Sequence, residues 1–254
     1  NLMYLFGCNK NLGDYMNGKE LLIDGIEKIG LEISVEQANQ FMKYYEMLIE
    51  TNKVMNLTAI TELDEVIIKH FIDSLLVAKK INVNNFDSLI DVGTGAGFPG
   101  IPIKIMFPEI RVVLLDSLNK RLKFLNNVID ELGLKNITTV HGRAEDIAHM
   151  DEYREKFSLC VSRAVANLST LSEYCIPFIN ESGIFISYKS EFSEEETDNA
   201  KKAIKVLGGK IEDTYIEELP HSDINRSFVV IKKERSTSNK YPRKAGVPSK
   251  KPIR

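Results

Sequence analysis

A glycine-rich loop between residues 89 and 100 carries the residues whose spacing most clearly suggests chemistry. The segment Leu89-Ile-Asp-Val-Gly-Thr-Gly-Ala-Gly-Phe-Pro-Gly100 begins as a short apolar strand and continues into Gly93, Gly95 and Gly97. Glycine is needed where a backbone turns sharply and approaches a bound molecule closely. In open α/β sheets, ligands bind beyond the carboxyl ends of the strands, which is where this loop would lie. The loop therefore predicts a small-molecule site.

Two kinds of nucleotide fit such a loop. Gly95, Gly97 and Gly100 satisfy the G-x-G-x-x-G pattern of dinucleotide sites, although that pattern alone is weakly specific. Asp91 lies inside the strand just before the first glycine, and its carboxylate would repel a pyrophosphate but attract an ammonium group. The loop therefore favours S-adenosyl-L-methionine, which carries an ammonium group. A nicotinamide dinucleotide and a binding-only relative are the alternatives.

Further acidic residues follow the next two predicted strands. Asp116 ends the second strand, where a carboxylate can accept hydrogen bonds from both ribose hydroxyls of an adenosyl group. Ala144, Glu145 and Asp146 follow the third strand, where methyltransferases commonly contact adenine. Both nucleotide classes use the ribose contact, so Asp116 does not distinguish between them.

The hydrophobic pattern around these residues alternates between strands and helices. Strands are predicted at 88–92, 111–116, 137–141, 157–162, 183–188, 210–219 and 226–232, and helices at 99–107, 120–132, 168–179 and 193–207. Strict alternation indicates a parallel sheet covered by helices on both faces. The last two strands have only a turn between them and should form an antiparallel hairpin. We expect an α/β, Rossmann-like fold of the class I methyltransferase type, with about seven strands.

The chain divides into four predicted regions. Residues 1–15 are interpreted as a non-native or disordered leader, and residues 16–85 as a helical extension with three amphipathic stretches. Residues 86–233 form the predicted cofactor-binding domain. Residues 234–254 form a basic tail: from residue 232 onward there are nine Lys or Arg residues and one acid, although the whole chain has a net charge of −3. Its prolines predict an extended tail, which either binds an anionic partner or is a solvated, disordered end.

Composition narrows the protein class. Hydrophobic residues make up 43% and charged residues 27% of the 254 residues, which is ordinary for a soluble globular protein. No apolar run is long enough to predict a membrane span, and the first residues lack the features of a secretory signal. Cys8, Cys160 and Cys175 fit neither a disulfide framework nor a zinc site, and no two histidines have metal-ligand spacing. We therefore expect a cytoplasmic monomer without a metal.

Seven short motifs occur in order from about residue 16 to the C-terminus. They are Asn56-Leu-Thr-Ala59, His70-Phe-Ile-Asp-Ser-Leu75, the loop from Asp91 to Pro102, Leu115-Asp-Ser-Leu-Asn-Lys-Arg121, Arg143-Ala-Glu145, Ser162-Arg-Ala164 and Tyr241-Pro-Arg-Lys244. In combination they resemble the RsmG family, also called GidB. The resemblance implies transfer of a methyl group from S-adenosyl-L-methionine to N7 of one guanine in the 530 loop of 16S ribosomal RNA, with S-adenosyl-L-homocysteine as product. The implied partner is 16S RNA or the small ribosomal subunit.

The resemblance also implies roles for single residues at the cofactor. Gly93 and Phe98 should line its site, and Asp116 should hold the ribose. Ala144 and Glu145 should contact the adenine region. Together with Asp91, Gly95 and Gly97, these residues make up the predicted cofactor site.

Methylation at N7 of guanine needs positioning rather than proton transfer, because N7 has a free lone pair and no proton. By the resemblance, Arg163 should lie near the methionine end of the cofactor or the target base. Arg143, Arg163 and Phe98 are candidates to support an unstacked base, and Lys189 could meet a phosphate. The alternatives are core packing for Phe98, a surface ion pair for Arg143 and a solvated charge for Lys189.

His70 lies three residues before Asp73, a pairing that can indicate acid–base catalysis. With no proton to remove from N7, we favour a structural hydrogen-bonding role for this histidine. Two other functions stay open at this point: a methyltransferase acting on a small molecule or protein, and a nucleotide-binding protein without catalysis. If the tail follows RNA phosphates, deleting residues 239–254 should flatten the salt dependence of RNA binding.

Overall fold

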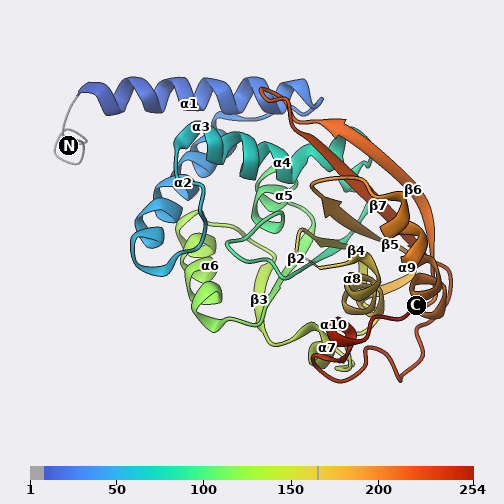
Figure 1. Cartoon of the computed structure of the whole chain (residues 1–254). Coiled ribbons are helices and arrows are strands. Elements are labelled where there is room, and N and C mark those ends of the chain that lie inside the picture. Colours follow the sequence, from blue (N-terminus) through green and yellow to red (C-terminus); the bar gives the residue numbers. More distant parts are fainter. Residues whose placement is uncertain (1–8, 165) are drawn as a thin grey trace.

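A seven-stranded sheet forms the centre of the molecule in the computed structural model, which describes residues 9–164 and 166–254 (Figure 1). Its strands, in spatial order, are β3 (Ile137–His141), β2 (Arg111–Asp116), β1 (Ser88–Val92), β4 (Phe157–Ser162), β5 (Ile179–Lys189), β7 (Asn225–Lys233) and β6 (Gly209–Glu218). The strands from β3 to β5 run parallel, and β7 pairs antiparallel with both β5 and β6. The predicted α/β fold with a terminal hairpin is confirmed.

Strand β1 is the point at which the strand order reverses. The chain continues from β1 to β2 and β3 on one side and returns to place β4 on the other. All five residues of β1 are buried, the polar Ser88 and Asp91 included, because both faces of a parallel strand are covered. Such a reversal leaves a crevice at the carboxyl ends of the strands, and the glycine loop begins there.

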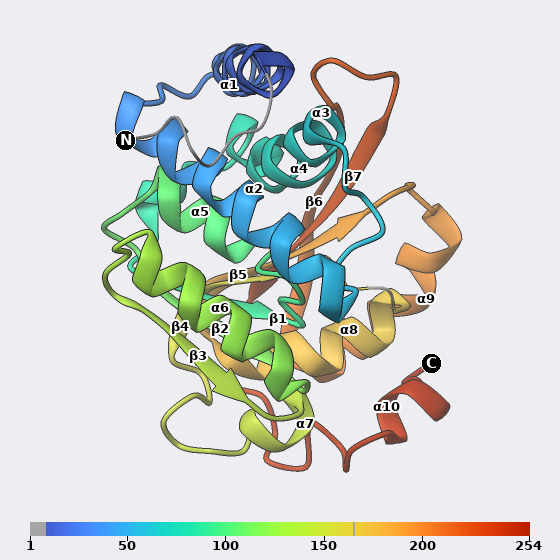
Figure 2. The same cartoon turned by 90° about the vertical axis from the view of Figure 1, so that its left-hand side faces the viewer.

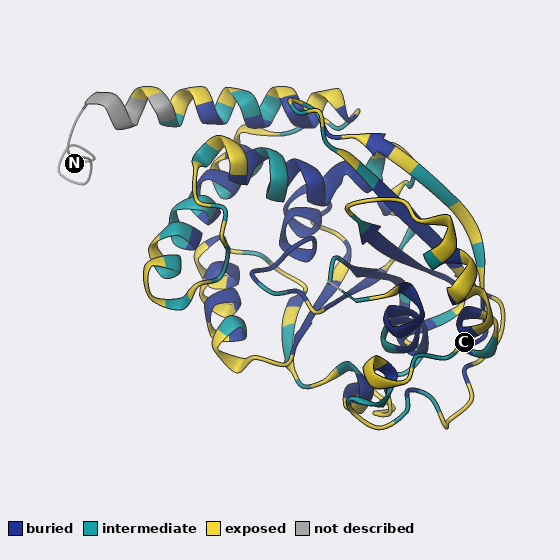
Figure 3. Ribbon diagram, viewed as in Figure 1, coloured by how far each residue is buried: buried dark blue, intermediate teal, exposed yellow. Residues whose placement is uncertain are grey.

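Two helical layers cover the sheet (Figures 1 and 2). One contains α1 (Asn9–Lys28), α2 (Val35–Met55), α5 (Gly100–Met106) and α6 (Asn119–Glu131), and the other contains α8 (Leu168–Cys175) and α9 (Glu194–Val206). Successive strand residues enter opposite cores, so that Leu89 belongs to the first and Ile90 to the second. Figure 3 shows the inner strands as largely buried, whereas the edge strands β3 and β6 are partly exposed.

The N-terminal helices pack into the first of these cores. Helix α2 begins at a capping box, in which Ser34 Oγ accepts from the Gln37 N–H and Gln37 Oε1 accepts from the Ser34 N–H. Helix α1 begins at Asn9, so residues 9–15 of the expected leader are helical rather than disordered. Residues 1–8 of that leader lie outside the described residues.

The helix predicted after Thr61 is irregular. It consists of α3 (Leu63–Val66), a π-helical turn η2 (Ile67–Ile72), α4 (Asp73–Leu75) and a 3₁₀ turn η3 (Leu76–Lys79), and a further 3₁₀ turn, η4 (Val83–Asn85), leads into β1. A hydrophobic period of 3.6 residues cannot reveal a π-helical turn, which often marks a functional site. This turn contains His70 and is followed directly by Asp73.

The basic tail is folded against the body. The guanidinium of Arg154 donates hydrogen bonds to the carbonyls of Thr237, Ser238 and Tyr241, and the side chain of Thr237 is buried. The tail ends in a short helix, α10 (Val247–Lys250), near α7 (Ala144–Ile147) (Figure 1). The prediction of a wholly extended tail is therefore wrong. Helix α10 tolerates its proline because the proline lies in the first turn, where a backbone N–H would have no partner within the helix.

The structure also bears on the cysteines, on membrane-spanning helices and on metal sites. Cys160 and Cys175 are buried and free of disulfides, as small apolar side chains would be. Throughout residues 9–164 and 166–254, no helix has the length and apolar character needed to cross a bilayer. Within the same ranges, no group of three or more His, Cys, Asp or Glu residues is arranged to hold a metal ion.

Candidate active site

A cavity of about 340 Å³ opens beside the glycine loop, at the carboxyl ends of β1, β2 and β4. We call it the glycine-loop cavity. The residues that line it include five predicted site residues, namely Gly93, Asp116, Arg143, Ala144 and Glu145. Helix α8 adds Leu171 and Tyr174, which the sequence did not predict. Asp91, Gly95, Gly97 and Phe98 are not among the lining residues.

Asp116 closes the glycine loop from the end of β2. Its Oδ2 accepts from the Gly95 N–H at 2.9 Å and from Arg121 Nη1 at 3.3 Å, and its Oδ1 accepts from the Leu118 N–H at 2.8 Å. The carboxylate is 3% exposed and lines the cavity. Its position is therefore fixed by the backbone of two loops, before any ligand is bound.

The three glycines of the loop serve different purposes. Gly93, Gly95 and Gly97 all have positive φ, between 61° and 104°, which L side chains rarely adopt. A Cβ on Gly93 would meet only Ala164 across the cavity, at 3.4 Å. A Cβ on Gly97 would lie 2.5 Å from Tyr44 Oη, so this glycine allows α2 to pack against the loop. At Gly93, the absence of a side chain leaves room for a ligand to approach the backbone. At Gly97, the absence of a side chain lets Tyr44 pack closely against the loop.

Asp91 is fully buried behind the loop. Its Oδ2 accepts from Thr94 Oγ1 at 2.7 Å and from the Gly100 N–H at 2.8 Å, whereas its Oδ1 has no hydrogen-bond partner among the described residues. Burial raises the pKa of this carboxyl from 3.8 to about 6. A buried acceptor without a partner is costly, so Oδ1 is suited to a nearby cation.

The C-terminal tail supports the outer wall of the glycine-loop cavity. The Gly246 N–H donates to Glu145 Oε1 at 3.0 Å, and Glu145 lines the cavity. Arg243 donates to both carboxylate oxygens of Glu173, a residue of α8 that is 0% exposed. Thr170 Oγ1, also on α8, donates to the Pro248 carbonyl. Two elements that form the cavity wall, α7 and α8, are therefore tied to the tail.

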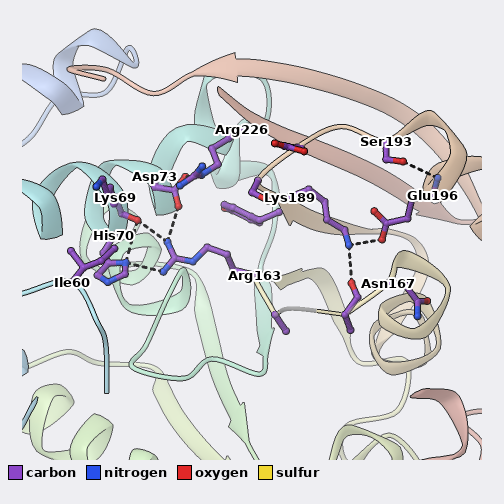
Figure 4. Close-up of a pocket in the computed structure, with 15 residues that line it drawn as sticks. Ile60, Lys69, His70, Asp73, Arg163, Asn167, Lys189, Ser193, Glu196 and Arg226 are labelled. Carbon is purple, nitrogen blue, oxygen red and sulfur yellow. Dashed lines mark hydrogen bonds and ion pairs between the residues drawn. The ribbon is translucent and has the colours of Figure 1, made fainter. Parts of the chain in front are cut away.

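A larger cavity of about 690 Å³ adjoins the first, because Ala164 lines both. We call it the Asp73 cavity (Figure 4). It is lined by residues of η2, the β4–α8 loop, the end of β5 and β7; those with charged or imidazole side chains are Lys69, His70, Asp73, Arg163, Lys189, Glu191, Glu196 and Arg226. Arg163 and Lys189 were predicted site residues, and the other six were not.

Asp73 holds two arginines that come from distant parts of the chain. Its Oδ2 accepts from Arg163 Nη1 at 2.8 Å, and its Oδ1 accepts from Arg226 Nε at 2.7 Å (Figure 4). Asp73 is 2% exposed, so its side of both ion pairs is buried away from water. Arg163 immediately follows β4 and Arg226 lies on β7, so the carboxylate joins the parallel part of the sheet to its hairpin.

Phe98 and His70 form the support behind Arg163. The guanidinium lies 5.1 Å from the Phe98 ring centroid, and its Nη2 is 3.2 Å from His70 Nδ1. His70 also stacks on Phe98, with 4.6 Å between centroids, and its Nε2 is 2.8 Å from Thr58 Oγ1. Burial, with Arg163 nearby, lowers the pKa of His70 from 6.5 to about 3. Phe98 is therefore packed in the core, which was the alternative to a role in base support. The hydrogen bonds of His70 hold neighbouring side chains in place, as expected for a structural residue.

The other predicted cations have separate surroundings. Lys189 Nζ donates to Glu196 Oε1 at 2.7 Å and to the Ala166 carbonyl at 2.8 Å, so it is not a solvated charge. A phosphate contact by Lys189 stays a prediction. Arg143 is exposed at the glycine-loop cavity and forms no ion pair within the described residues. The predicted positioning residues are therefore divided between two cavities.

Some residues that line the two cavities or support their walls were not predicted from the sequence. Arg226 lies near the start of β7 and Glu173 lies on α8, and neither has a neighbour in sequence that suggests its partner. The motif Tyr241-Pro-Arg-Lys244 was recognised by resemblance, but a contact between Arg243 and α8 cannot be derived from charge composition. Both omissions concern ion pairs between residues 70 or more positions apart.

Comparison with known proteins places the chain in a family. The family model for rRNA small subunit methyltransferase G matches residues 37–223. Relatives named Ribosomal RNA small subunit methyltransferase G include that of Acetivibrio thermocellus, 54% identical over 92% of this chain and 96% of its own length. The Clostridium kluyveri relative is 52% identical over 92% and 98%, and that of Lachnoclostridium phytofermentans is 48% identical over 94% and 98%. This chain therefore belongs to the rRNA small subunit methyltransferase G family.

Proposed function

We propose that this protein transfers a methyl group from S-adenosyl-L-methionine to N7 of a guanine in the 530 loop of 16S ribosomal RNA. The observation that carries the proposal is the meeting of two cavities at Ala164. The glycine-loop cavity would take the cofactor, and the Asp73 cavity would take the target nucleotide. The name shared by the relatives supports ribosomal RNA as the substrate class.

The residues around the glycine-loop cavity fit this cofactor, which supplies an activated methyl group on a sulfonium when bound. Asp116, fixed by the glycine loop, would accept the ribose hydroxyls, and Ala144 with Glu145 would border the adenine. Asp91 Oδ1 has no hydrogen-bond partner in the part of the chain that the structure describes, which suits an ammonium group. Because Asp91 lies behind the loop, we expect its charge to act on that ammonium across the loop.

The residues of the Asp73 cavity are suited to positioning rather than to proton transfer. Guanine N7 attacks with its own lone pair, so the chain has no proton to remove. His70 is neutral near pH 7 because its pKa is lowered to about 3, and its nitrogens already have partners. Orientation alone can supply roughly 7–11 kcal/mol of the barrier reduction. We therefore assign no general base.

Arg163 is the residue best placed to orient the target. It directly precedes Ala164, where the two cavities meet, and Asp73, His70 and Phe98 restrict its guanidinium. A planar guanidinium can stack on a base or hold a phosphate in a fixed direction. Asp73 acts through Arg163 and is a positioning residue.

Methylation of small-subunit RNA that lacks the modification tests the proposal. Purified protein and S-adenosyl-L-methionine should produce N7-methylguanosine at one position of 16S RNA, and mapping should find none without protein. Asp73→Asn should lower the rate while S-adenosyl-L-homocysteine still binds. Asp223→Asn, an exposed carboxylate on the β6–β7 turn, is the matched control and should retain full activity. An unchanged RNA modification pattern with wild-type protein would overturn the proposal.

The same assay separates the two alternative functions. Turnover on a protein or small molecule, without RNA methylation, would indicate a different substrate class. Binding of S-adenosyl-L-homocysteine without any turnover would indicate a binding protein. We further propose that the protein acts as a cytoplasmic monomer on 16S RNA or the small subunit, which light scattering and particle-binding assays would check.

A further inference from the structure

We propose that a third cavity, beside the Asp73 cavity, binds the base of an RNA nucleotide adjacent to the target guanine. This inference rests on the proposed function, and it adds a stacking subsite centred on Phe192. The cavity has a volume of about 330 Å³ and is lined by Ser190, Glu191, Phe192, Ile216, Asn225, Arg226 and Ser227. We call it the Phe192 cavity.

The Phe192 cavity is continuous with the Asp73 cavity. Ser190, Glu191 and Arg226 line both. A strand of RNA that places one base in the larger cavity would therefore bring its neighbour to the smaller one. Ordinary single-stranded RNA recognition presents successive bases to separate pockets in this way.

Phe192 has the exposure expected of a stacking platform. Among the large hydrophobic side chains that are exposed in the described part of the chain, Phe192 is the aromatic one, with 41% of its surface accessible. Ile216, on the edge strand β6, is 56% exposed and lines the same cavity. Bases stack on exposed aromatic rings, and a neighbouring aliphatic side chain extends the apolar surface.

Arg226 supplies a cation between the two base positions. Its Nε is held by Asp73 at 2.7 Å, and within residues 9–164 and 166–254 its two terminal nitrogens donate no hydrogen bond. A guanidinium fixed at Nε, with both terminal nitrogens free, can bind a phosphate through two parallel hydrogen bonds. A phosphate that links two adjacent nucleotides would fit this boundary between the cavities.

Two polar groups in the Phe192 cavity favour a base over a purely apolar ligand. Ser227 is 2% exposed, and its Oγ has no hydrogen-bond partner in the described structure. Glu191 would repel a phosphate but can accept a hydrogen bond from an amino group of a base. The arrangement therefore assigns the base to the cavity and its phosphate to Arg226.

Substitution of Phe192 tests the subsite. With an RNA substrate at fixed salt, Phe192→Ala should raise KM for RNA about fivefold to thirtyfold, with a smaller effect on kcat. Phe192→Tyr should stay close to wild type because it keeps the ring, and Phe192→Leu should not. Val54→Ala, an exposed apolar residue at the end of α2, is the control and should match wild type. S-Adenosyl-L-homocysteine binding and the salt slope should not change, because no charge is removed.

A second arm changes the RNA instead of the protein. An abasic nucleotide on one side of the target guanine should weaken the substrate as much as Phe192→Ala does, and the combination should add nothing further. Equal KM values for wild type and Phe192→Ala, or full additivity at both neighbouring positions, would overturn the inference. If wild-type protein methylates no RNA, the proposed function fails. In that case anisotropy with the same RNA still shows whether Phe192 contributes to RNA binding.

Discussion

Replacement of Arg243 by methionine tests whether the basic tail is part of the folded body. Glu173 is 0% exposed, and its carboxylate accepts from the Arg243 backbone N–H at 2.8 Å and from Nη2 at 2.6 Å, besides two contacts from Nε. Removing one partner of a buried ion pair leaves an uncompensated charge and costs about 3–5 kcal/mol. Arg243 is 28% exposed, so we take the lower value, about 3 kcal/mol.

Thermal unfolding gives the measurement. In a chain of this size, 1 kcal/mol shifts Tm by about 2–4 °C, so Arg243→Met should melt roughly 6–12 °C below wild type. Lys244→Met, at the exposed neighbouring position, should stay within about 0.5 kcal/mol. Adding Glu173→Leu to Arg243→Met should recover much of the loss, because no buried charge then remains. A single variant as stable as wild type would refute the view that Glu173 depends on the tail.

Three further predictions concern the two cavities. The affinity for S-adenosyl-L-homocysteine, measured by calorimetry, should fall as the pH drops below about 6, because protonated Asp91 no longer attracts an ammonium group. The variant Asp91→Asn should bind this ligand weakly at every pH, without that dependence. The folded-state pKa of His70, about 3, lies below its ordinary value of 6.5, so the unfolded chain takes up the proton first and stability falls as pH drops below 6.5. Denaturant titrations should show a shallower fall for His70→Gln, and an identical pH profile would contradict this. Gly97→Ala should destabilise far more than Gly95→Ala in the same titrations, because both have positive φ but only the first brings a Cβ within 3.0 Å of other side chains; equal losses would show that packing against α2 is irrelevant.

The glycine loop and the position of Asp116 beside it could be predicted because their signals are local. A strand, its terminal glycines and an acid at the end of the next strand are all visible within a few residues, and parallel strands bring their carboxyl ends together. The prediction went too far in treating the glycines alike. Gly93 borders a cavity, whereas Gly97 is required by Tyr44, which lies on a helix more than 50 residues earlier in the chain. Only the packing of that helix distinguishes the two.

The Asp73 cavity could be predicted only in part, because it is assembled from distant segments. Asp73 meets Arg163 and Arg226 across 90 and 153 residues, and no periodicity reports such a pair. The π-helical turn that directly precedes Asp73 is equally invisible to a 3.6-residue pattern. The family resemblance implied that Phe98 lies at the cofactor, but the turn of the loop directs it to His70 and Arg163 instead.

The pairing of charges suggests that different cations of the protein orient the RNA and provide the affinity for it. Each cation of the Asp73 cavity has an acidic partner: Lys69 pairs with Glu65, Lys189 with Glu196, and Arg163 and Arg226 with Asp73. Such cations hold donors in fixed directions but contribute little net attraction for a polyanion, since salt-dependent affinity follows the phosphates that are neutralised. Exposed cations such as Lys244, Lys250 and Lys251 therefore suit the affinity role better. Because Arg243 anchors the same segment to Glu173, deletion of residues 239–254 would disturb the wall of the glycine-loop cavity together with RNA binding, and neutralising the exposed lysines alone separates the two effects.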